Sequence, residues 1–80
     1  MDPMLGQIVL FAGNFAPRGW ELCAGQLMPV NRNLPLFSLL GATFGGDGTT
    51  NFALPDLQSH VPASGLNYII AVEGTFPARD

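Results

Sequence analysis

The sequence contains no lysine, and its only basic residues besides one histidine are Arg18, Arg32 and Arg79. Charged residues make up 11% of the chain, against roughly 25% in an ordinary soluble domain, and the formal net charge is -3. Proteins bind nucleic-acid backbones by neutralising phosphates with clustered Lys and Arg. The lack of such clusters therefore argues against nucleic acid, and equally against an anionic membrane surface, as a partner.

Cysteine and histidine occur once each, as Cys23 and His60. A single cysteine cannot form an intrachain disulfide, and one cysteine with one histidine cannot build a structural zinc site. We expect no cofactor. An 80-residue chain buries only about 60% of its unfolded surface, and 48% of this chain is hydrophobic. Because disulfides and metals are excluded, association with other copies is the remaining aid to stability.

Long hydrophobic runs are also absent. No apolar stretch reaches the roughly 18 residues of a membrane span, and residues 1–7 lack the charged start and apolar core of a signal peptide. We therefore expect no membrane insertion. If the protein leaves its cell, we expect lysis or a route that the sequence does not reveal.

The chain does carry a glycine-rich run at residues 41–57, GATFGGDGTTNFALPDL. A phosphate-binding loop would need a Lys-Ser/Thr pair after its last glycine and a following helix, which Pro55 blocks. The run therefore predicts a tight surface loop and then an extended segment that packs Phe52 and Leu54. Asp47 could contribute to a calcium site, but one carboxylate is weak provision, so we expect it to bond its own turn amides.

Apolar, β-forming runs predict the strands. Residues 7–12, QIVLFA, read as a buried strand. Residues 20–23 and 27–30 suggest a hairpin that turns at Gly25-Gln26, with Pro29 ending the second strand or confining it to an edge. Residues 66–72, LNYIIAV, are apolar on both faces. Either this strand or the strand at residues 7–12 is expected to meet a neighbouring chain by packing or edge pairing, the alternative being that residues 66–72 form a wholly internal central strand.

One short helix is predicted at residues 33–40, with Asn33 as its cap and Gly41 as its stop. Two turns cannot stand alone, so its leucines must pack on the sheet. The fold class is therefore mainly β with one short helix, a small α+β domain that strand exchange between subunits could complete. We expect one domain over residues 1–80, with residues 1–6 as a loose or intersubunit arm.

No set of residues suggests catalysis, and we expect the protein not to be an enzyme. Trp20 is predicted to be the largest core residue. Cys23 has no adjacent cation, so a buried inert thiol is favoured over a reactive one. His60 could bind metal across a symmetry axis, but a loop histidine without a function is the better interpretation.

Three segments taken together resemble the phage tail collar domain family, in the branch called microcystin-dependent proteins. They are GQIVLFAGNFAPRGWELCAGQLMPV, LFSLLGATFGGDGTTNFALPDL and LNYIIAVEGTFPAR, and they span nearly the whole chain. The chain departs from the usual pattern where Cys23-Ala24-Gly25 replaces Cys-Asp-Gly and Ser59-His60-Val61-Pro62 replaces Gly-Arg-Val-Pro. Members of the family usually carry a long variable region between the collar segment and the final strand. In this chain, residues 63–65 are all that remains of it.

The resemblance implies a collar module without its receptor-binding head. We therefore expect a non-enzymatic structural protein of a virion tail or extracellular fibre that self-assembles into a homo-oligomer, either a closed trimer or an open filament. The residues expected at the subunit interface are Met4, Leu5, Ile8, Leu10, Leu66, Tyr68, Ile69, Ile70 and Phe76.

The alternative function is an adhesion module of tail-fibre type that binds a host or a cell-surface glycan. The residues expected to contact the glycan are Trp20, Phe44 and Asp47, because aromatic faces stack on sugar rings. This alternative requires Trp20 to be at least partly exposed.

Overall fold

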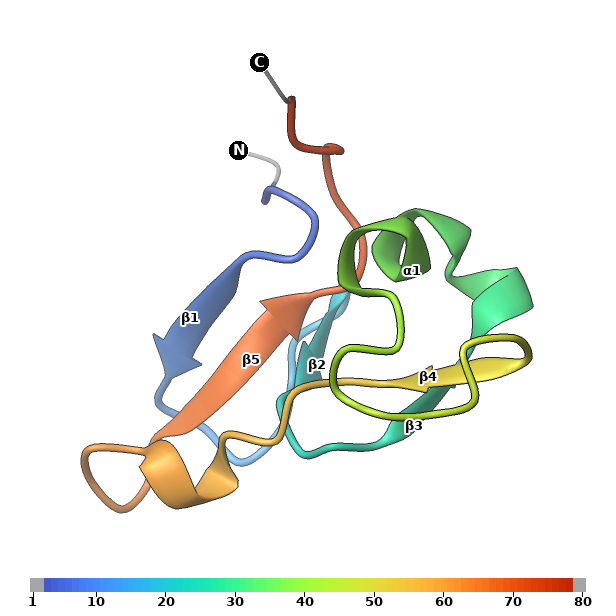
Figure 1. The fold of residues 1–80 in the computed structure, drawn as a ribbon. Coiled ribbons are helices and arrows are strands. Elements are labelled where there is room, and N and C mark those ends of the chain that lie inside the picture. Colours follow the sequence, from blue (N-terminus) through green and yellow to red (C-terminus); the bar gives the residue numbers. More distant parts are fainter. Residues whose placement is uncertain (1–2, 79–80) are drawn as a thin grey trace.

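The structure, a computed structural model, describes residues 3–78. Within that range the chain forms short strands, one α-helix and two 3-10 turns (Figure 1). The strands are β1 (Ile8–Phe11), β2 (Trp20–Leu22), β3 (Leu27–Pro29), β4 (Asn51–Ala53) and β5 (Asn67–Ala71). The helix α1 is Leu34–Leu40, and the 3-10 turns are Val30–Arg32 and Gln58–His60.

The strands form two antiparallel sheets. In the three-stranded sheet β5 is central, with Ile70 opposite Ile8 of β1 on one side and opposite Glu21 of β2 on the other. In the two-stranded sheet Met28 of β3 lies opposite Phe52 of β4. The prediction of a mainly β fold with one short helix is confirmed. Residues 66–72 form the central strand, one of the two roles expected of them.

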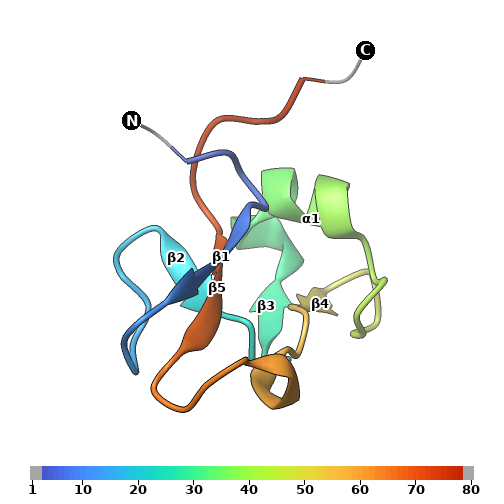
Figure 2. The same ribbon diagram turned by 90° about the vertical axis from the view of Figure 1, so that its left-hand side faces the viewer.

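The hydrophobic core joins the three-stranded sheet to α1, β3 and β4, which lie beside it in Figure 2. Phe52 and Leu54 are fully buried, which confirms the packing predicted for the segment after the glycine-rich loop. The Phe37 ring of α1 packs on Phe52 with 5.4 Å between ring centroids. The buried members of the core cluster are Leu5, Cys23, Val30, Leu36, Phe52, Leu54 and Ile70.

Both faces of β5 are covered within one chain, since Ile69, Ile70 and Ala71 are buried in succession. Successive strand residues point to opposite faces, so one face meets the core and the other needs a second cover. The connection from β1 to β2 has to pass β5, and Asn67 Nδ2 donates a 2.7 Å hydrogen bond to the Gly13 carbonyl on it. This hydrogen bond attaches the loop to the start of β5.

The predicted hairpin between β2 and β3 is wrong, because the two strands belong to different sheets. Residues 23–26 instead run beside residues 54–57: Leu54 N donates to Gln26 O and Leu57 N donates to Cys23 O. The Gln26 side chain also binds back to the chain before it, by donating to Leu22 O and accepting from Ala24 N. Pairing with the buried segment at Leu54 therefore replaces the local turn.

The helix begins and ends near its predicted limits, but its cap differs. Asn33 occupies the N-cap position, yet its side-chain Nδ2 donates to Pro29 O at 2.9 Å rather than accepting from a helix amide. The preceding 3-10 turn brings the Pro29 carbonyl within reach. At the other end, the Gly41 amide bonds to Phe37 O, and Gly41 has a φ of +56° that favours glycine.

Trp20 is not the largest core residue. It lies in β2 outside the core cluster and is partly exposed, and Phe52 has the largest fully buried side chain. In the antiparallel register Trp20 lies opposite Ala71, whose neighbour Ile70 belongs to the core cluster. Trp20 therefore points to the sheet face away from the core.

The first and last described segments leave the fold at the same end (Figures 1 and 2). Leu5 N donates to Thr75 O, Thr75 N donates to Pro3 O, and Leu5 is 5% exposed. The described part of the expected arm, residues 3–6, is thus attached to the fold within one chain, while Met1 and Asp2 lie outside the described residues. Over residues 3–78, no helix is long and apolar enough to cross a membrane.

Candidate assembly surface

Several large apolar side chains are exposed on the described surface. Four of the residues predicted to contact another subunit are among them: Met4, Ile8, Leu10 and Phe76. Tyr68 and Leu66 are partly exposed. The other three, Leu5, Ile69 and Ile70, are buried within the subunit itself, so they are not on its surface. The remaining large exposed apolar residues are Phe15, Leu27, Leu34, Leu39 and Phe44.

The sheet edges decide where another strand could add. Each sheet has two outer edges, and along each edge every second residue points its backbone N–H and C=O away from the sheet. An open edge is a template for pairing with another chain, so proteins usually cover it or block it.

The glycine-rich loop covers the outer edge of β4. Ala53 N donates to Gly45 O and Gly48 N donates to Asn51 O, both at 3.0 Å. Gly46 approaches the strand so closely that a Cβ at this position would lie 2.6 Å from the Phe52 Cα. The glycines thus allow the loop backbone to lie directly on the strand.

Asp47 holds this loop closed. One carboxylate oxygen accepts from the backbone amides of Thr49, Thr50 and Asn51, and the other accepts from the Thr50 hydroxyl at 2.6 Å. The Thr50 hydroxyl and the three amides favour the charged carboxylate and hold the pKa of Asp47 well below its usual range. The prediction that Asp47 bonds its own turn amides is confirmed.

The outer edge of β3 is partly blocked at Pro29. Leu54 N donates to Gln26 O and Val30 N donates to Thr50 O, so residues 26, 28 and 30 bond toward β4 while 27 and 29 point outward. Pro29 has no N–H, and its carbonyl accepts from Asn33 Nδ2. Only Leu27 keeps outward backbone groups there, which fits the expectation that Pro29 ends the strand at an edge.

The outer edge of β2 is closed in part by the chain itself. Cys23 N donates to Tyr68 O and Val72 N donates to a carbonyl before β2, so alternate residues of β2 bond to β5. Of the outward residues, Trp20 gives its N–H to Pro17 O and Leu22 gives its carbonyl to the Gln26 side chain. One group on each outward residue is therefore occupied.

The outer edge of β1 is open. Ala71 N donates to Gln7 O, which sets the alternation so that Val9 and Phe11 bond to β5 while Ile8 and Leu10 point away from the sheet. Within residues 3–78, no hydrogen bond joins the backbone of Ile8 or Leu10 to anything beyond this sheet. Figure 1 shows β1 at the outside of the three-stranded sheet.

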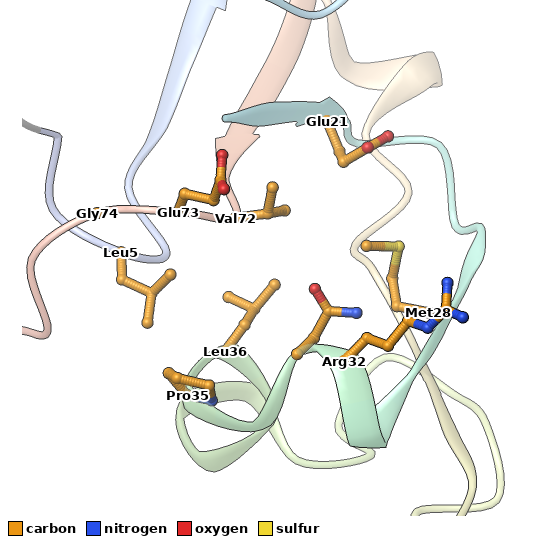
Figure 3. Close-up of a pocket in the computed structure, with 10 residues that line it drawn as sticks. Leu5, Glu21, Met28, Arg32, Pro35, Leu36, Val72, Glu73 and Gly74 are labelled. Atoms are coloured by element: carbon orange, nitrogen blue, oxygen red, sulfur yellow. The ribbon is translucent and has the colours of Figure 1, made fainter. Parts of the chain in front are cut away.

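A pocket of about 420 Å³ lies between the three-stranded sheet and the start of α1 (Figure 3). Leu5, Leu36 and Val72 give it apolar walls, while Glu21, Glu73 and Arg32 supply charged groups. Over the described residues, no three His, Cys, Asp or Glu side chains are grouped so that they could hold a metal ion. The pocket is large enough for one or two side chains of another molecule.

Cys23 and His60 lie apart from this pocket. Cys23 is 2% exposed, which confirms that this cysteine is buried, and burial raises the pKa of its thiol to about 11. His60 is exposed at the end of a 3-10 turn, as expected of a loop histidine. Whether symmetry brings copies of His60 together stays a prediction.

The residues predicted to contact a glycan are divided between two parts of the fold. Trp20 is partly exposed in the three-stranded sheet, whereas Phe44 and Asp47 precede β4 in the loop of the other sheet. Phe44 is exposed, and the Asp47 carboxylate is already engaged by its own loop. Glycan binding stays a prediction.

Comparison with protein families matches residues 6–62 to the phage tail collar domain, more than half of the chain. The chain belongs to the phage tail collar domain family. No curated protein sequence matches it significantly. The family is one of structural modules of phage tails, so membership implies a structural role at the virion tail. The assignment to the microcystin-dependent branch stays a prediction.

The region matched to the family ends before the last strand of the fold. Residues 6–62 include β1 to β4, α1 and the glycine-rich loop, but they end before β5. β5 nevertheless pairs with both β1 and β2, which would otherwise have no partner in this sheet. The last strand thus completes the sheet from outside the matched region, after only a short connection.

Proposed function

We propose that this collar domain is a non-enzymatic structural protein that self-associates into a closed trimer or an extended filament, in a virion tail or an extracellular fibre. The observation that carries the proposal is the exposure of Met4, Ile8, Leu10 and Phe76 in a domain with few charges. Met4 bridges to Thr75, the neighbour of Phe76, and Ile8 and Leu10 follow in β1. Exposed apolar patches are typical of surfaces that meet another chain. Family membership supports the same role.

The subunits meet as complete domains in this proposal. β5 is paired on both sides within its own chain, so lending it to a neighbour would require a complete sheet to open. Contact through the surface of β1 and the terminal segments needs no such rearrangement. The choice between trimer and filament then depends on whether the rotation between neighbouring subunits closes on itself.

Electron microscopy of the purified protein tests the proposal, since it distinguishes discrete particles from extended fibres. The test variant replaces Met4, Ile8, Leu10 and Phe76 with serine. The control replaces Leu27 and Leu34, which are also exposed but belong to β3 and α1, with serine. We expect the wild type and the control to assemble and the test variant to remain as single subunits. Assembly of the test variant to the wild-type extent would refute the proposed surface.

A further inference from the structure

The open edge of β1 differs from the other three sheet edges because all of its backbone N–H and C=O groups that point away from the sheet are free to bond to another strand. The glycine-rich loop covers β4, Pro29 and Asn33 block part of β3, and a turn and Gln26 occupy half of the outward groups of β2. On β1 the N–H and C=O of both Ile8 and Leu10 have no partner within the described part of the chain. The fold therefore leaves one edge prepared to accept a strand.

The usual devices against edge pairing are missing from Ile8–Phe11 itself, although a glycine bulge comes directly before it, where Gly6 N donates to Ala71 O and Ala71 N donates to Gln7 O. Its sequence, Ile8-Val9-Leu10-Phe11, contains no charge, no proline and no glycine. The side chains of Ile8 and Leu10 are 40% and 42% exposed, so apolar surface accompanies the unpaired backbone. Strands that stay solvated at an edge normally carry a charge, a proline or a bulge.

We propose that β1 pairs antiparallel with β1 of a second copy about a twofold axis, with Ile8 opposite Leu10 of the partner and Val9 opposite Val9 of the partner. The pairing joins two three-stranded sheets into one continuous sheet. It rests on the proposed self-association and selects the filament over the closed trimer, because a twofold contact through one edge cannot close a ring of three subunits. Discrete trimers in electron microscopy would therefore contradict this pairing while leaving self-association intact. In a filament, this contact would alternate with a second, different one.

A second copy suits this edge because the edge is complementary to itself. In an antiparallel pair, two residues that face each other with outward groups exchange both N–H···O=C bonds. Two such pairs, Ile8 with Leu10 and Leu10 with Ile8, use every open group on both strands. Because β1 is uncharged, no like charges face each other across the axis, and the exposed apolar side chains lie directly opposite.

A cysteine at position 9 tests the register in the full-length protein. Val9 and its copy form a pair without hydrogen bonds, in which Cα atoms are about 4.5 Å apart, within the range that a disulfide accepts. The control is Ile8→Cys, since the two copies of residue 8 are offset along the strands and lie beyond about 7 Å. Cys23 is buried and does not compete.

Under mild oxidation we expect Val9→Cys to form a covalent dimer at least about tenfold faster than Ile8→Cys. Random collisions would give the opposite order, because Ile8 is exposed and Val9 is partly buried. Equal rates, or faster reaction of Ile8→Cys, would overturn the proposed pairing. A strand from another part of a second copy would also fail to link residue 9 to itself.

Leu10→Pro supplies the second test. Proline at this position removes an outward N–H but no hydrogen bond to β5. Because both copies carry the substitution, two interchain hydrogen bonds are lost. We expect the dissociation constant to rise about 30-fold or more. Leu27→Pro, at the outward-facing residue of β3, is the control and should associate as the wild type does.

The outcomes separate this inference from the proposed function. If sedimentation shows the wild type as a single chain at all concentrations, both fail. If the wild type associates but Leu10→Pro, folded by circular dichroism, associates equally well, the β1 pairing is wrong and self-association stands. Should Leu10→Pro not fold, the relative linking rates at positions 8 and 9 still decide.

Discussion

Gly46→Ala should lower the free energy of unfolding by more than the backbone strain of a non-glycine residue at positive φ accounts for. The φ of Gly46 is +90°, so a side chain there costs about 1 kcal/mol in backbone strain. Its Cβ would also lie 2.6 Å from the Phe52 Cα and 2.9 Å from the Asn51 Oδ1. Because Phe52 is fully buried in the core, the strand cannot move away, and the loop must.

Moving the loop breaks the bonds that cover the edge of β4. These are Ala53 N to Gly45 O and Gly48 N to Asn51 O. At about 1 kcal/mol for each hydrogen bond, the loss is about 2 kcal/mol, and with the strain the free energy of unfolding falls by about 3 kcal/mol.

Gly65→Ala is the matched control. Gly65 has a φ of +85°, but a Cβ there would meet no atom within 4 Å, so only the strain of about 1 kcal/mol applies. The two variants should therefore differ by about 2 kcal/mol, or about 8–16 °C in melting temperature for a domain of this size.

Thermal and urea unfolding followed by circular dichroism would measure this difference. All samples need the same protein concentration, because association raises the apparent stability. If Gly46→Ala and Gly65→Ala melt within about 2 °C of each other, the loop yields without cost, and the reasoning that it must lie directly on β4 is refuted.

Three further predictions address other parts of the fold. The Cys23 thiol, with its pKa raised to about 11, should not react with a thiol reagent at pH 8 in the native protein but should react fully after denaturation; rapid native reaction would show that the side chain is accessible. The lowered pKa of Asp47 means that its carboxylate stabilises the fold above its unfolded pKa of about 3.9, and that this contribution is lost as pH falls toward the folded pKa. The stability gap between the wild type and Asp47→Ala should therefore narrow below about pH 4 in acid unfolding curves, and a constant gap would contradict the role of the charge. Gly74→Ala should detach the two terminal segments, because a Cβ there would clash with the Pro3 carbonyl, and faster hydrogen exchange at the Leu5 amide would report it; unchanged exchange would count against that pairing.

The sequence predicted the elements better than their arrangement. The runs around β1 and β5 and the short helix were recognisable because each combines suitable residue types with clear ends, such as Gly41 after α1. The expectation that the first run is a buried strand was wrong, because Ile8 and Leu10 lie at the sheet edge and are exposed. The pairing of β2 with β5 was not predicted, because a glycine between two short apolar runs is also typical of a hairpin turn. Only the buried segment at Leu54, distant in sequence, shows why β2 and β3 separate.

Burial and edges depend on strand order, and so they were harder to predict. Trp20 was expected in the core because of its size, but the sheet register turns it to the opposite face. Ile8 and Leu10 were expected at a subunit contact together with Ile69 and Ile70, which are covered within the chain. Within residues 3–78, β1 is the edge strand that keeps all of its outward backbone groups open, which follows from which strands lie at the edges and from how loops cover the rest.

The most direct test of self-association is the mass of the wild-type protein in solution. Sedimentation equilibrium from low micromolar to high micromolar concentration should give masses that rise with concentration above the 8.5 kDa of one chain. The account predicts an approach to whole-number multiples of that mass, or sedimentation as long fibres. A mass of 8.5 kDa across the whole range would contradict it.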